Sequence, residues 1–217
     1  MVGNADSLSK GSPSRSIQAP ALTPTIPAKD AAEQNAIERR YECVVDQARL
    51  DAWLAKLAAA DLVCVDTETT GLDALVAELV GISLCAEEGV ACYIPLAHRT
   101  GEDQLDRQAV LDQMRPWLED ASRYKVGQNL KYDTHIFANY GITLRGIQHD
   151  TLLESYVLES HLAHNMDSLA ERHLGVKTIR YEEVCGKGAH QIGFDQVDLA
   201  TATNYAAEDA DITLRLH

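Results

Sequence analysis

The chain has 217 residues, of which 46% are hydrophobic and 24% charged, which is typical of a soluble globular protein and excludes a collagen, a coiled coil or a disordered chain. Its 33 acidic and 19 basic side chains give a formal net charge of −14, which disfavours non-specific binding along nucleic acid but not specific use of a nucleic-acid end. No apolar run approaches the roughly 20 residues of a membrane-spanning helix, so no membrane partner is expected.

The cysteines indicate a reducing environment. There are five, and no C-x-x-C motif occurs, so neither a disulfide framework nor a zinc ribbon is expected. Cys64, Cys85 and Cys92 lie in apolar runs and are predicted to be buried, reduced thiols. Because no signal peptide follows Met1, we expect a cytoplasmic protein.

Residues 1–40 differ in composition from the rest of the chain. They hold four of the six prolines and no aromatic residue. Such a stretch buries too little apolar surface to offset its ordering entropy. We interpret it as a flexible linker or arm, followed by a globular domain over residues 41–217. A linker in this place suggests a piece of a longer chain, and the alternative is a disordered tail without a partner.

Hydrophobic periodicity predicts an α/β domain with a mixed sheet. Alternating or short apolar runs predict strands at residues 41–45, 62–67, 79–84, 90–96 and 124–126, with a hairpin turn at 87–89. Helical spacing of apolar residues predicts helices after Asp46 and over residues 106–118, 129–140, 150–159, 167–174 and 198–216. Residues 176–196 are predicted to be irregular.

Two carboxylates stand at the end of the strand predicted at residues 62–67. Side chains alternate along a strand, so Asp66 and Glu68 are expected on one face of the sheet. Like charges about 4 Å apart repel by roughly 4 kcal/mol at an effective dielectric of 20, and a divalent cation would remove that cost. Taken alone, a D-x-E pair is more often a surface pair or a helix cap than a metal site.

Two further acidic motifs lie in predicted helices. Asp133 falls in the first turns of the helix that Asn129 opens, where the helix dipole also favours a carboxylate. Tyr205 and Asp209 are four residues apart on the last helix and therefore share a face. Each motif alone is equally well explained by capping, packing or a solvated charge.

In this order, the three motifs together resemble the DEDD superfamily of 3′–5′ exonucleases, in its Tyr-containing branch. Five segments further resemble the proofreading domain of bacterial DNA polymerase I: DTETTGLD (66–73), VGQNLKYD (126–133), DTLLESYVL (150–158), MDSLAERHLG (166–175) and YAAEDADITLRLH (205–217). The resemblance covers residues 41–217. It implies a ribonuclease H-like α/β fold, in which a mixed five-stranded sheet is flanked by helices.

The resemblance also implies which residues act. Four carboxylates are implied to bind two divalent cations, Mg²⁺ or Mn²⁺: Asp66, Glu68, Asp133 and Asp209. Tyr205 is implied to position the attacking water. The implied reaction hydrolyses a phosphodiester bond at the 3′ end of DNA and releases a nucleoside 5′-monophosphate. The branch that uses His carries it one residue earlier, where this chain has Asn204, and this favours the Tyr branch.

Five residues near these motifs are candidates for substrate contacts. Leu72 would wedge against the terminal base. Gln128, Asn129 and Lys131 would touch the sugar or phosphate, and the guanidinium group of Arg172 is a candidate phosphate ligand. The ordinary alternatives are a helix cap for Asn129, a solvated charge for Lys131 and a surface ion pair for Arg172.

The expected partners are a single-stranded or frayed DNA 3′ end, the nucleoside monophosphate product and the polymerase domain of a parent chain. One alternative is a free-standing RNA exonuclease similar to ribonuclease D. Another is a non-catalytic DNA-binding scaffold, against which the intact set of carboxylates counts. His161 and His164 lie three residues apart, but nothing nearby completes a zinc set, so a surface pair is expected.

Overall fold

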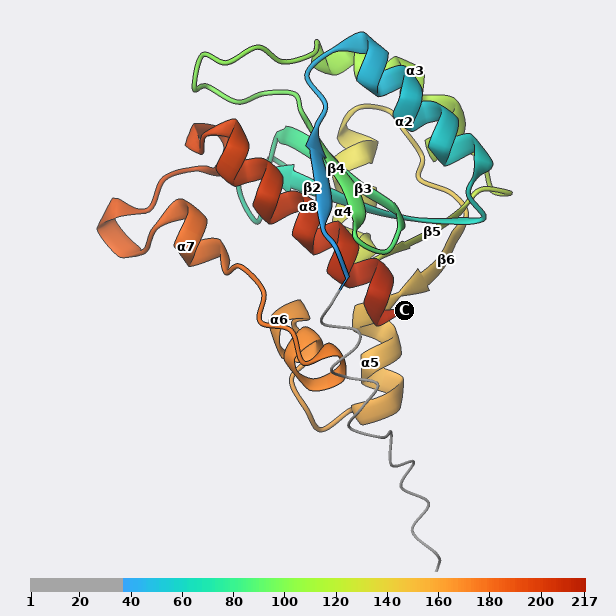
Figure 1. Ribbon diagram of the computed structural model, residues 1–217, viewed down its shortest axis with the longest axis vertical. Coiled ribbons are helices and arrows are strands. Elements are labelled where there is room, and N and C mark those ends of the chain that lie inside the picture. Colours follow the sequence, from blue (N-terminus) through green and yellow to red (C-terminus); the bar gives the residue numbers. More distant parts are fainter. Residues whose placement is uncertain (1–36) are drawn as a thin grey trace, which may run out of the picture.

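A six-stranded mixed sheet lies at the centre of the protein (Figure 1). The computed structural model describes residues 37–217, so the predicted arm lies outside the described residues except for positions 37–40. The strand order is β1-β4-β3-β2-β5-β6. The bounds are β1 Arg40–Cys43, β2 Leu62–Thr69, β3 Leu79–Glu87, β4 Val90–Pro95, β5 Tyr124–Gly127 and β6 Ile147–Asp150. β3 pairs antiparallel with β2 and β4, and the remaining neighbours are parallel.

The predicted α/β class and mixed sheet are confirmed, with one strand more than the five expected. All five strands predicted from the sequence are present, and the 87–89 hairpin turn joins β3 to β4. The additional strand, β6, has the sequence Ile-Gln-His-Asp and extends the sheet beyond β5. Because it is a short, exposed edge strand, no apolar alternation marks it in the sequence.

Helices lie on both sides of this sheet. Their bounds are α2 Gln47–Ala59, α3 Arg107–Leu118, α4 Leu130–Asn139, α5 Thr151–Glu159, α6 Met166–Leu169 with a π-helical turn at Ala170–Leu174, α7 Tyr181–Cys185 and α8 Leu199–Leu216. Asp46, Asp106 and Asp198 cap α2, α3 and α8 by accepting a hydrogen bond from the third backbone N–H beyond each of them. The prediction of an irregular segment at 176–196 is wrong for α7, which is too short to show helical periodicity.

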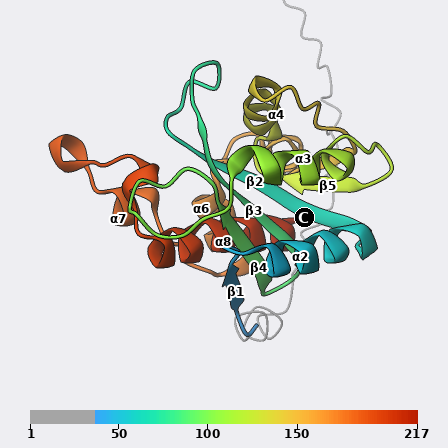
Figure 2. The ribbon, with the colours of Figure 1, turned by 90° about the horizontal axis from the view of Figure 1, so that it is seen from above.

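Alternation along β2 sends successive side chains to opposite faces of the sheet. Val63 and Val65 join the core formed with α2, α3 and α4, whereas Cys64 packs with Ala207 and Ala210 of α8. α8 contacts β1 to β5 and runs across the sheet (Figure 1). Figure 2 shows α3 and α4 on the side of the sheet opposite α8, and the segment around α7 projects sideways in both views.

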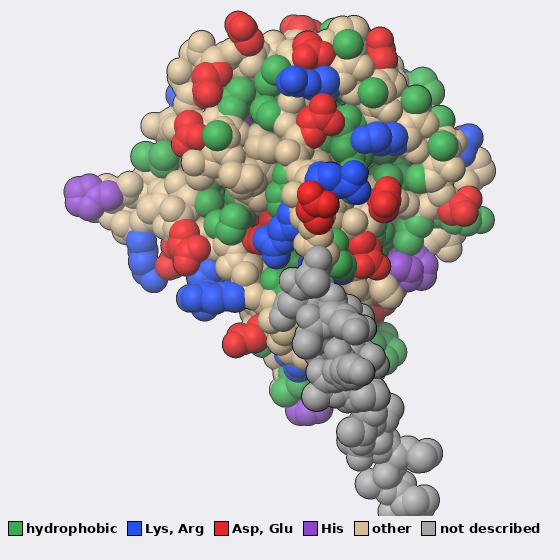
Figure 3. All heavy atoms as spheres, viewed as in Figure 1, with side chains coloured by type: hydrophobic (Ala, Val, Ile, Leu, Met, Phe, Trp, Pro, Cys, Tyr) green, Lys and Arg blue, Asp and Glu red, His purple; other side chains and the backbone are tan. Residues whose placement is uncertain are grey.

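The cysteines behave as the sequence predicts. All five are unpaired thiols, and Cys64, Cys85 and Cys92 are fully buried. Within residues 37–217, no helix is long and apolar enough to cross a membrane. On the face shown in Figure 3, Lys and Arg side chains lie among Asp and Glu side chains rather than in a continuous band, which agrees with the weak non-specific affinity for nucleic acid expected from the net charge.

The last residues of the predicted arm belong to the fold. Arg40 begins β1, and the Arg39 guanidinium donates a hydrogen bond to the buried carboxylate of Glu208 on α8. Glu208 also accepts from the backbone N–H of Ile179 at 2.6 Å. The start of β1 is thus tied to the helix that carries two of the predicted site residues. The domain boundary at residue 40 stays a prediction, because residues 1–36 lie outside the described part.

Candidate active site

Asp66 and Glu68 lie on the face of β2 that α8 covers. Cys64, on the same face, packs against Ala207 of α8. Cross-strand pairing places Asp66 opposite Ser83 of β3, whose hydroxyl donates a long hydrogen bond of 3.4 Å to the carboxylate. Glu68 is buried and Asp66 is partly exposed. The strand therefore presents both carboxylates to α8, as alternation predicts.

Asp133 reaches the site from α4. Its buried carboxylate accepts a hydrogen bond of 2.5 Å from the hydroxyl of Thr67 in β2. The start of α4 is held by Asp150, which accepts from the backbone N–H groups of Asn129 and Leu130 at 3.1 and 2.9 Å. Asp150 also caps α5. One carboxylate thus fixes the β5–α4 turn and the start of α5 together.

Tyr205 and Asp209 complete the set from α8. Buried alanines such as Ala207 let this helix pack closely against the sheet. The Tyr205 ring lies edge-on to Tyr181 and close to Phe194, with centroid distances of 6.3 and 5.8 Å. The Tyr205 hydroxyl and the Asp209 carboxyl group each shift the pKa of the other, so the two groups lie near one another. The Oδ1 atom of Asp209 is buried and has no hydrogen-bond partner among the described residues.

Burial raises the pKa of all four carboxyl groups, and repulsion between carboxylates adds to the shift for Glu68, Asp133 and Asp209. Burial raises the pKa of Asp66 to about 6, although the hydrogen bond from Ser83 opposes this shift. Burial also raises the pKa of Glu68 well above its usual range, and repulsion from the other three carboxylates adds to it. The pKa values of Asp133 and Asp209 are raised by burial first and by Asp66 second. The four groups therefore lie close enough to oppose one another's ionisation.

This donor set fits divalent cations. Four carboxylates supply only hard oxygen donors, which Mg²⁺ and Mn²⁺ prefer. The unpartnered Oδ1 of Asp209 is a buried polar atom that costs free energy unless an ion or water satisfies it. A cation at this place would also favour the charged form of each carboxylate and oppose the pKa shifts. The residues present thus have the charge and the donors to hold cations.

Most of the chain matches a known protein family. Residues 41–217 match the family model described as 3′–5′ exonuclease, of the DNA polymerase A type. The chain belongs to this 3′–5′ exonuclease family. The DNA polymerase I of Pseudomonas aeruginosa is 54% identical over 182 residues, which cover 82% of this chain and 20% of that protein. The chain thus spans about a fifth of the length of the curated relatives it matches.

Solved structures share the fold of this exonuclease domain. The POL domain of Pol1 from M. smegmatis, in complex with DNA primer-template and dNTP, has a TM-score of 0.61 and 21% identity, and the match covers 81% of this chain and 26% of that chain. Ribonuclease D from Trypanosoma brucei has a TM-score of 0.63 and 14% identity, covering 83% and 64%. The ribonuclease H-like class is confirmed. At these identities the likeness concerns the fold alone, so the fold does not separate DNA from RNA substrates.

Leu72 lies in the loop that follows β2 and is 96% exposed. The loop is tied to α4, because the hydroxyl of Tyr132 donates to the carbonyl of Gly71 at 2.5 Å. Leu75 and Val76 are each 76% exposed in the same loop. No sequence signal marks Leu75 and Val76, since the exposure of an apolar side chain is not visible from its residue type. Together the three form an apolar tip beside the strand that carries the first two carboxylates.

Asn129 does not cap α4. It adopts the left-handed conformation, with φ of 66°, and is the only residue other than glycine with positive φ in the described chain. Its exposed side chain makes no capping hydrogen bond within the described residues. Lys131 is exposed as well. Substrate contact stays a prediction for both.

Gln128 and Arg172 are engaged within the protein. Gln128 accepts a hydrogen bond from Thr151 and donates to the carbonyl of His164 at 2.9 Å. Arg172 donates to Glu159 at 2.8 Å, which is the ion pair considered as its ordinary explanation. These contacts give both side chains a structural role, and their contact with substrate stays a prediction.

The prediction that His161 and His164 form a surface pair is wrong for His164. His164 is buried, its ring lies against Tyr156 with a centroid distance of 3.7 Å, and its Nδ1 lies 2.9 Å from the hydroxyl of Ser155. His161 is exposed. The loop after α5 folds back over the helix and buries His164, which short-range spacing does not reveal.

Proposed function

We propose that residues 41–217 form a metal-dependent 3′–5′ exodeoxyribonuclease domain that hydrolyses the last phosphodiester bond of a DNA 3′ end and releases a nucleoside 5′-monophosphate. The residues that hold divalent cations, Mg²⁺ or Mn²⁺, are Asp66, Glu68, Asp133 and Asp209. Tyr205 positions the attacking water. The polymerase domain of a parent chain is the partner that would deliver the 3′ end. The cytoplasmic location expected from the unpaired thiols stays a prediction.

The observation that carries the proposal is the convergence of carboxylates from three separate elements, β2, α4 and α8. Burial raises the pKa of every one of them, and repulsion from neighbouring carboxylates adds to the shift for Glu68, Asp133 and Asp209. A fold that only needed stability would gain from replacing such a cluster, because each buried like charge costs free energy. Its retention beside an unpartnered buried oxygen of Asp209 supports a site built for cations.

Tyr205 acts as a positioning group. Bound cations would stabilise charge on the scissile phosphate and lower the pKa of a bound water. Burial, followed by the negative charges of Asp209 and Glu68, raises the pKa of Tyr205 well above its usual range. The hydroxyl therefore stays protonated at neutral pH. A neutral hydroxyl orients water by hydrogen bonding but does not take its proton, so Tyr205 is not the general base.

The surroundings of the carboxylates suit a single-stranded end. The exposed tip of Leu72, Leu75 and Val76 offers apolar surface against which a terminal base can stack. Asn129 and Lys131 are exposed at the start of α4, close in sequence to Asp133. Stacking and cation-bridged phosphates require no broad basic groove, which agrees with the net charge of −14.

The test is degradation of a 5′-labelled single-stranded DNA oligomer by the 217-residue chain with Mg²⁺ or Mn²⁺. A ladder that shortens from the 3′ end is expected, and EDTA should abolish it. Asp209→Ala should abolish it as well. Asp112→Ala, which removes an exposed carboxylate on α3, is the matched control and should cleave like the parent chain. Circular dichroism of each variant checks that it is folded.

Two outcomes would overturn the proposal. A ladder on an RNA oligomer of the same sequence, with none on DNA, would assign the chain to RNA processing. Absence of cleavage of DNA and RNA by folded, cation-loaded protein, including a DNA oligomer presented with the separate polymerase domain of a relative, would favour a non-catalytic role.

A further inference from the structure

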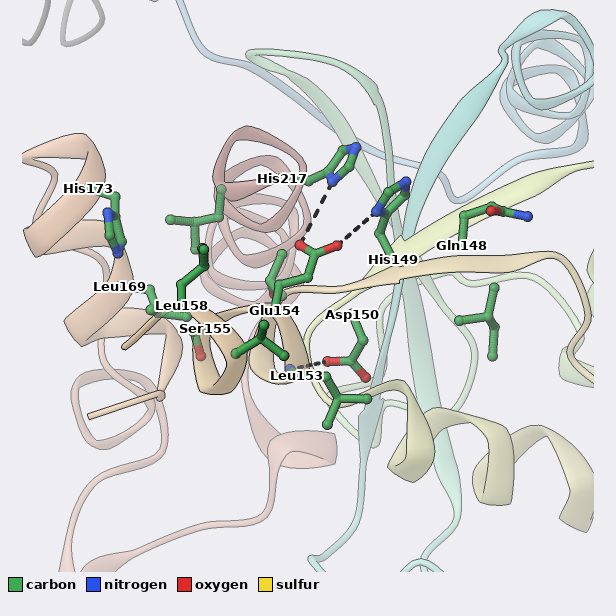
Figure 4. A pocket seen from close by; sticks show the side chains of 14 residues that line it. Gln148, His149, Asp150, Leu153, Glu154, Ser155, Leu158, Leu169, His173 and His217 are labelled. Atoms are coloured by element: carbon green, nitrogen blue, oxygen red, sulfur yellow. Dashed lines mark hydrogen bonds and ion pairs between the residues drawn. The ribbon is translucent and has the colours of Figure 1, made fainter. Parts of the chain in front are cut away.

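A second group of metal-binding side chains lies outside the carboxylate site, where β6, α5 and the end of α8 meet. His149 belongs to β6, Glu154 to α5, and His217 directly follows α8. The Nδ1 atom of His149 lies 2.8 Å from Oε1 of Glu154, and Nδ1 of His217 lies 3.8 Å from Oε2. Figure 4 shows both imidazole rings directed at this one carboxylate. Each oxygen thus faces one ring nitrogen.

The spacing of these atoms is close to that of a metal site. One ligand atom from each residue lies within 4.8 Å of the others, and the two ring centroids are 3.6 Å apart. Zinc bonds of about 2.0–2.1 Å to nitrogen and oxygen put tetrahedral ligands about 3.4 Å from one another. Small side-chain rotations would therefore bring the three atoms onto one ion without movement of the backbone.

We propose that His149, Glu154 and His217 bind a Zn²⁺ ion. Imidazole nitrogens suit Zn²⁺ and other transition metals, whereas Mg²⁺ and Ca²⁺ prefer oxygen donors throughout. Two imidazoles and one carboxylate are a known three-residue zinc set that leaves a fourth position for water or another ligand. The donor chemistry thus differs from that of the four carboxylates, and this proposal does not depend on the exonuclease activity.

The surroundings leave room for the fourth ligand. All three residues line a cavity of about 660 Å³, which apolar side chains of β6 and α5 also line, among them Ile147 and Leu153. None of the predicted catalytic residues lines this cavity. The side chains of the three ligands are between 28% and 38% exposed, so an ion can enter from solvent without unfolding.

A bound ion would connect three elements that hold the active site in place. α8 carries Tyr205 and Asp209, and the proposed ion would tie its end to β6 and α5. Asp150, the neighbour of His149, binds the backbone at the start of α4. The expected effect of zinc is therefore stabilisation of the folded chain, because an ion that binds only the native state raises the unfolding midpoint.

The test measures zinc binding to the untagged chain carrying Asp66→Asn and Asp209→Asn, so that the catalytic carboxylates do not contribute the signal. Zn²⁺ is titrated into chelator-treated protein by calorimetry, and thermal unfolding is followed in parallel. At a free Zn²⁺ concentration about 100 times the Kd, the unfolding midpoint should rise by about 5–10 °C. Substitution of Co²⁺ should give the visible absorption of a four-coordinate ion.

Variants separate this site from zinc bound elsewhere. His149→Ala, Glu154→Gln and His217→Ala should each weaken Zn²⁺ binding at least about tenfold, since even loss of an outer hydrogen bond costs that much at zinc sites. Glu154→Gln keeps a hydrogen-bond acceptor for His149 but lacks the negative ligand. His161→Ala and His190→Ala remove exposed imidazoles and should bind like the parent. Absence of zinc binding, or equal affinity in all five variants, would overturn the proposal and leave the cluster as hydrogen bonds only.

Discussion

The hydroxyl of Thr67 lies 2.5 Å from Oδ1 of Asp133, and this contact joins β2 directly to α4. Thr67 stands between Asp66 and Glu68, but alternation sends its side chain to the opposite face of the sheet. Three consecutive residues of β2 therefore place side chains of the site on both faces of the sheet. Two present carboxylates toward α8, and the hydroxyl between them holds the carboxylate that comes from α4.

Thr67→Val is expected to reduce activity more than stability. Valine keeps the shape of threonine but cannot donate, so the buried Asp133 carboxylate loses its partner at a cost of about 1–3 kcal/mol in the free energy of unfolding. Loss of its orientation should lower kcat/KM by about 100-fold. Urea unfolding and single-nucleotide release from labelled DNA measure the two effects. Thr67→Ser keeps the donor and should retain most of the activity; equal kcat/KM in both variants would show that the contact does not position Asp133.

Without metal, the chain should become less stable as the pH rises. Burial raises the pKa of Asp66 to about 6 in the folded state, whereas an unfolded Asp titrates near pH 3.9. Between these values the folded state binds more protons, so the free energy of unfolding falls as pH increases toward and through 6. The raised pKa values of Glu68, Asp133 and Asp209 act in the same direction.

Thermal unfolding in EDTA between pH 5 and 8 tests this dependence. Asp66→Asn should flatten the decline and raise the midpoint at pH 8, because it removes one of the repelling charges. With saturating Mn²⁺ the slope should reverse, since cations bind the deprotonated carboxylates. A midpoint of the parent chain that rises with pH in EDTA would contradict an electrostatically strained carboxylate cluster.

Local signals explain why much of the fold and site could be predicted from the sequence. Asp46 precedes a helix whose apolar residues have helical spacing. The strand that ends in Asp66 and Glu68 is recognisable from its run of apolar, β-branched residues. The order of the motifs predicts Asp133 and Asp209 as site residues, and the packing of α4 and α8 against β2 brings their elements together.

Other features depend on contacts that sequence spacing does not encode. Thr67 and Asp133 are 66 residues apart, and only the fold brings the hydroxyl to the carboxylate. His149 and His217 meet for the same reason, and neither belongs to a recognisable ligand motif. The exposed residues of β6 and the single turn of α7 give no periodicity to detect. Residue type alone allows Asn129 to cap α4, but its left-handed backbone, set by the tight turn between β5 and α4, is not encoded in sequence spacing.

Tyr205→Phe should slow the reaction without disturbing the fold. Phenylalanine keeps the ring packing against Tyr181 and Phe194 but lacks the hydroxyl that is expected to position the attacking water. Misplacement of the attacking water should lower kcat by about 100-fold, with KM little changed. Tyr124→Phe alters an exposed tyrosine of β5 and is the matched control. A kcat equal to that of the parent would remove Tyr205 from the catalytic mechanism.

Leu72→Ala should weaken substrate binding and leave stability unchanged. Leu72 is 96% exposed, so its truncation should change the free energy of unfolding by less than about 0.5 kcal/mol. If the side chain stacks against the terminal base, its loss should raise KM for single-stranded DNA about tenfold, near the lower end of measured base-stacking contributions. Steady-state release of nucleotides at several oligomer concentrations gives kcat and KM separately.

Leu153→Ala, which truncates an exposed leucine on α5, is the matched control and should leave KM unaltered. A KM unaffected by Leu72→Ala, and also by Leu72→Ala combined with Leu75→Ala, would mean that the apolar tip does not contact the DNA end.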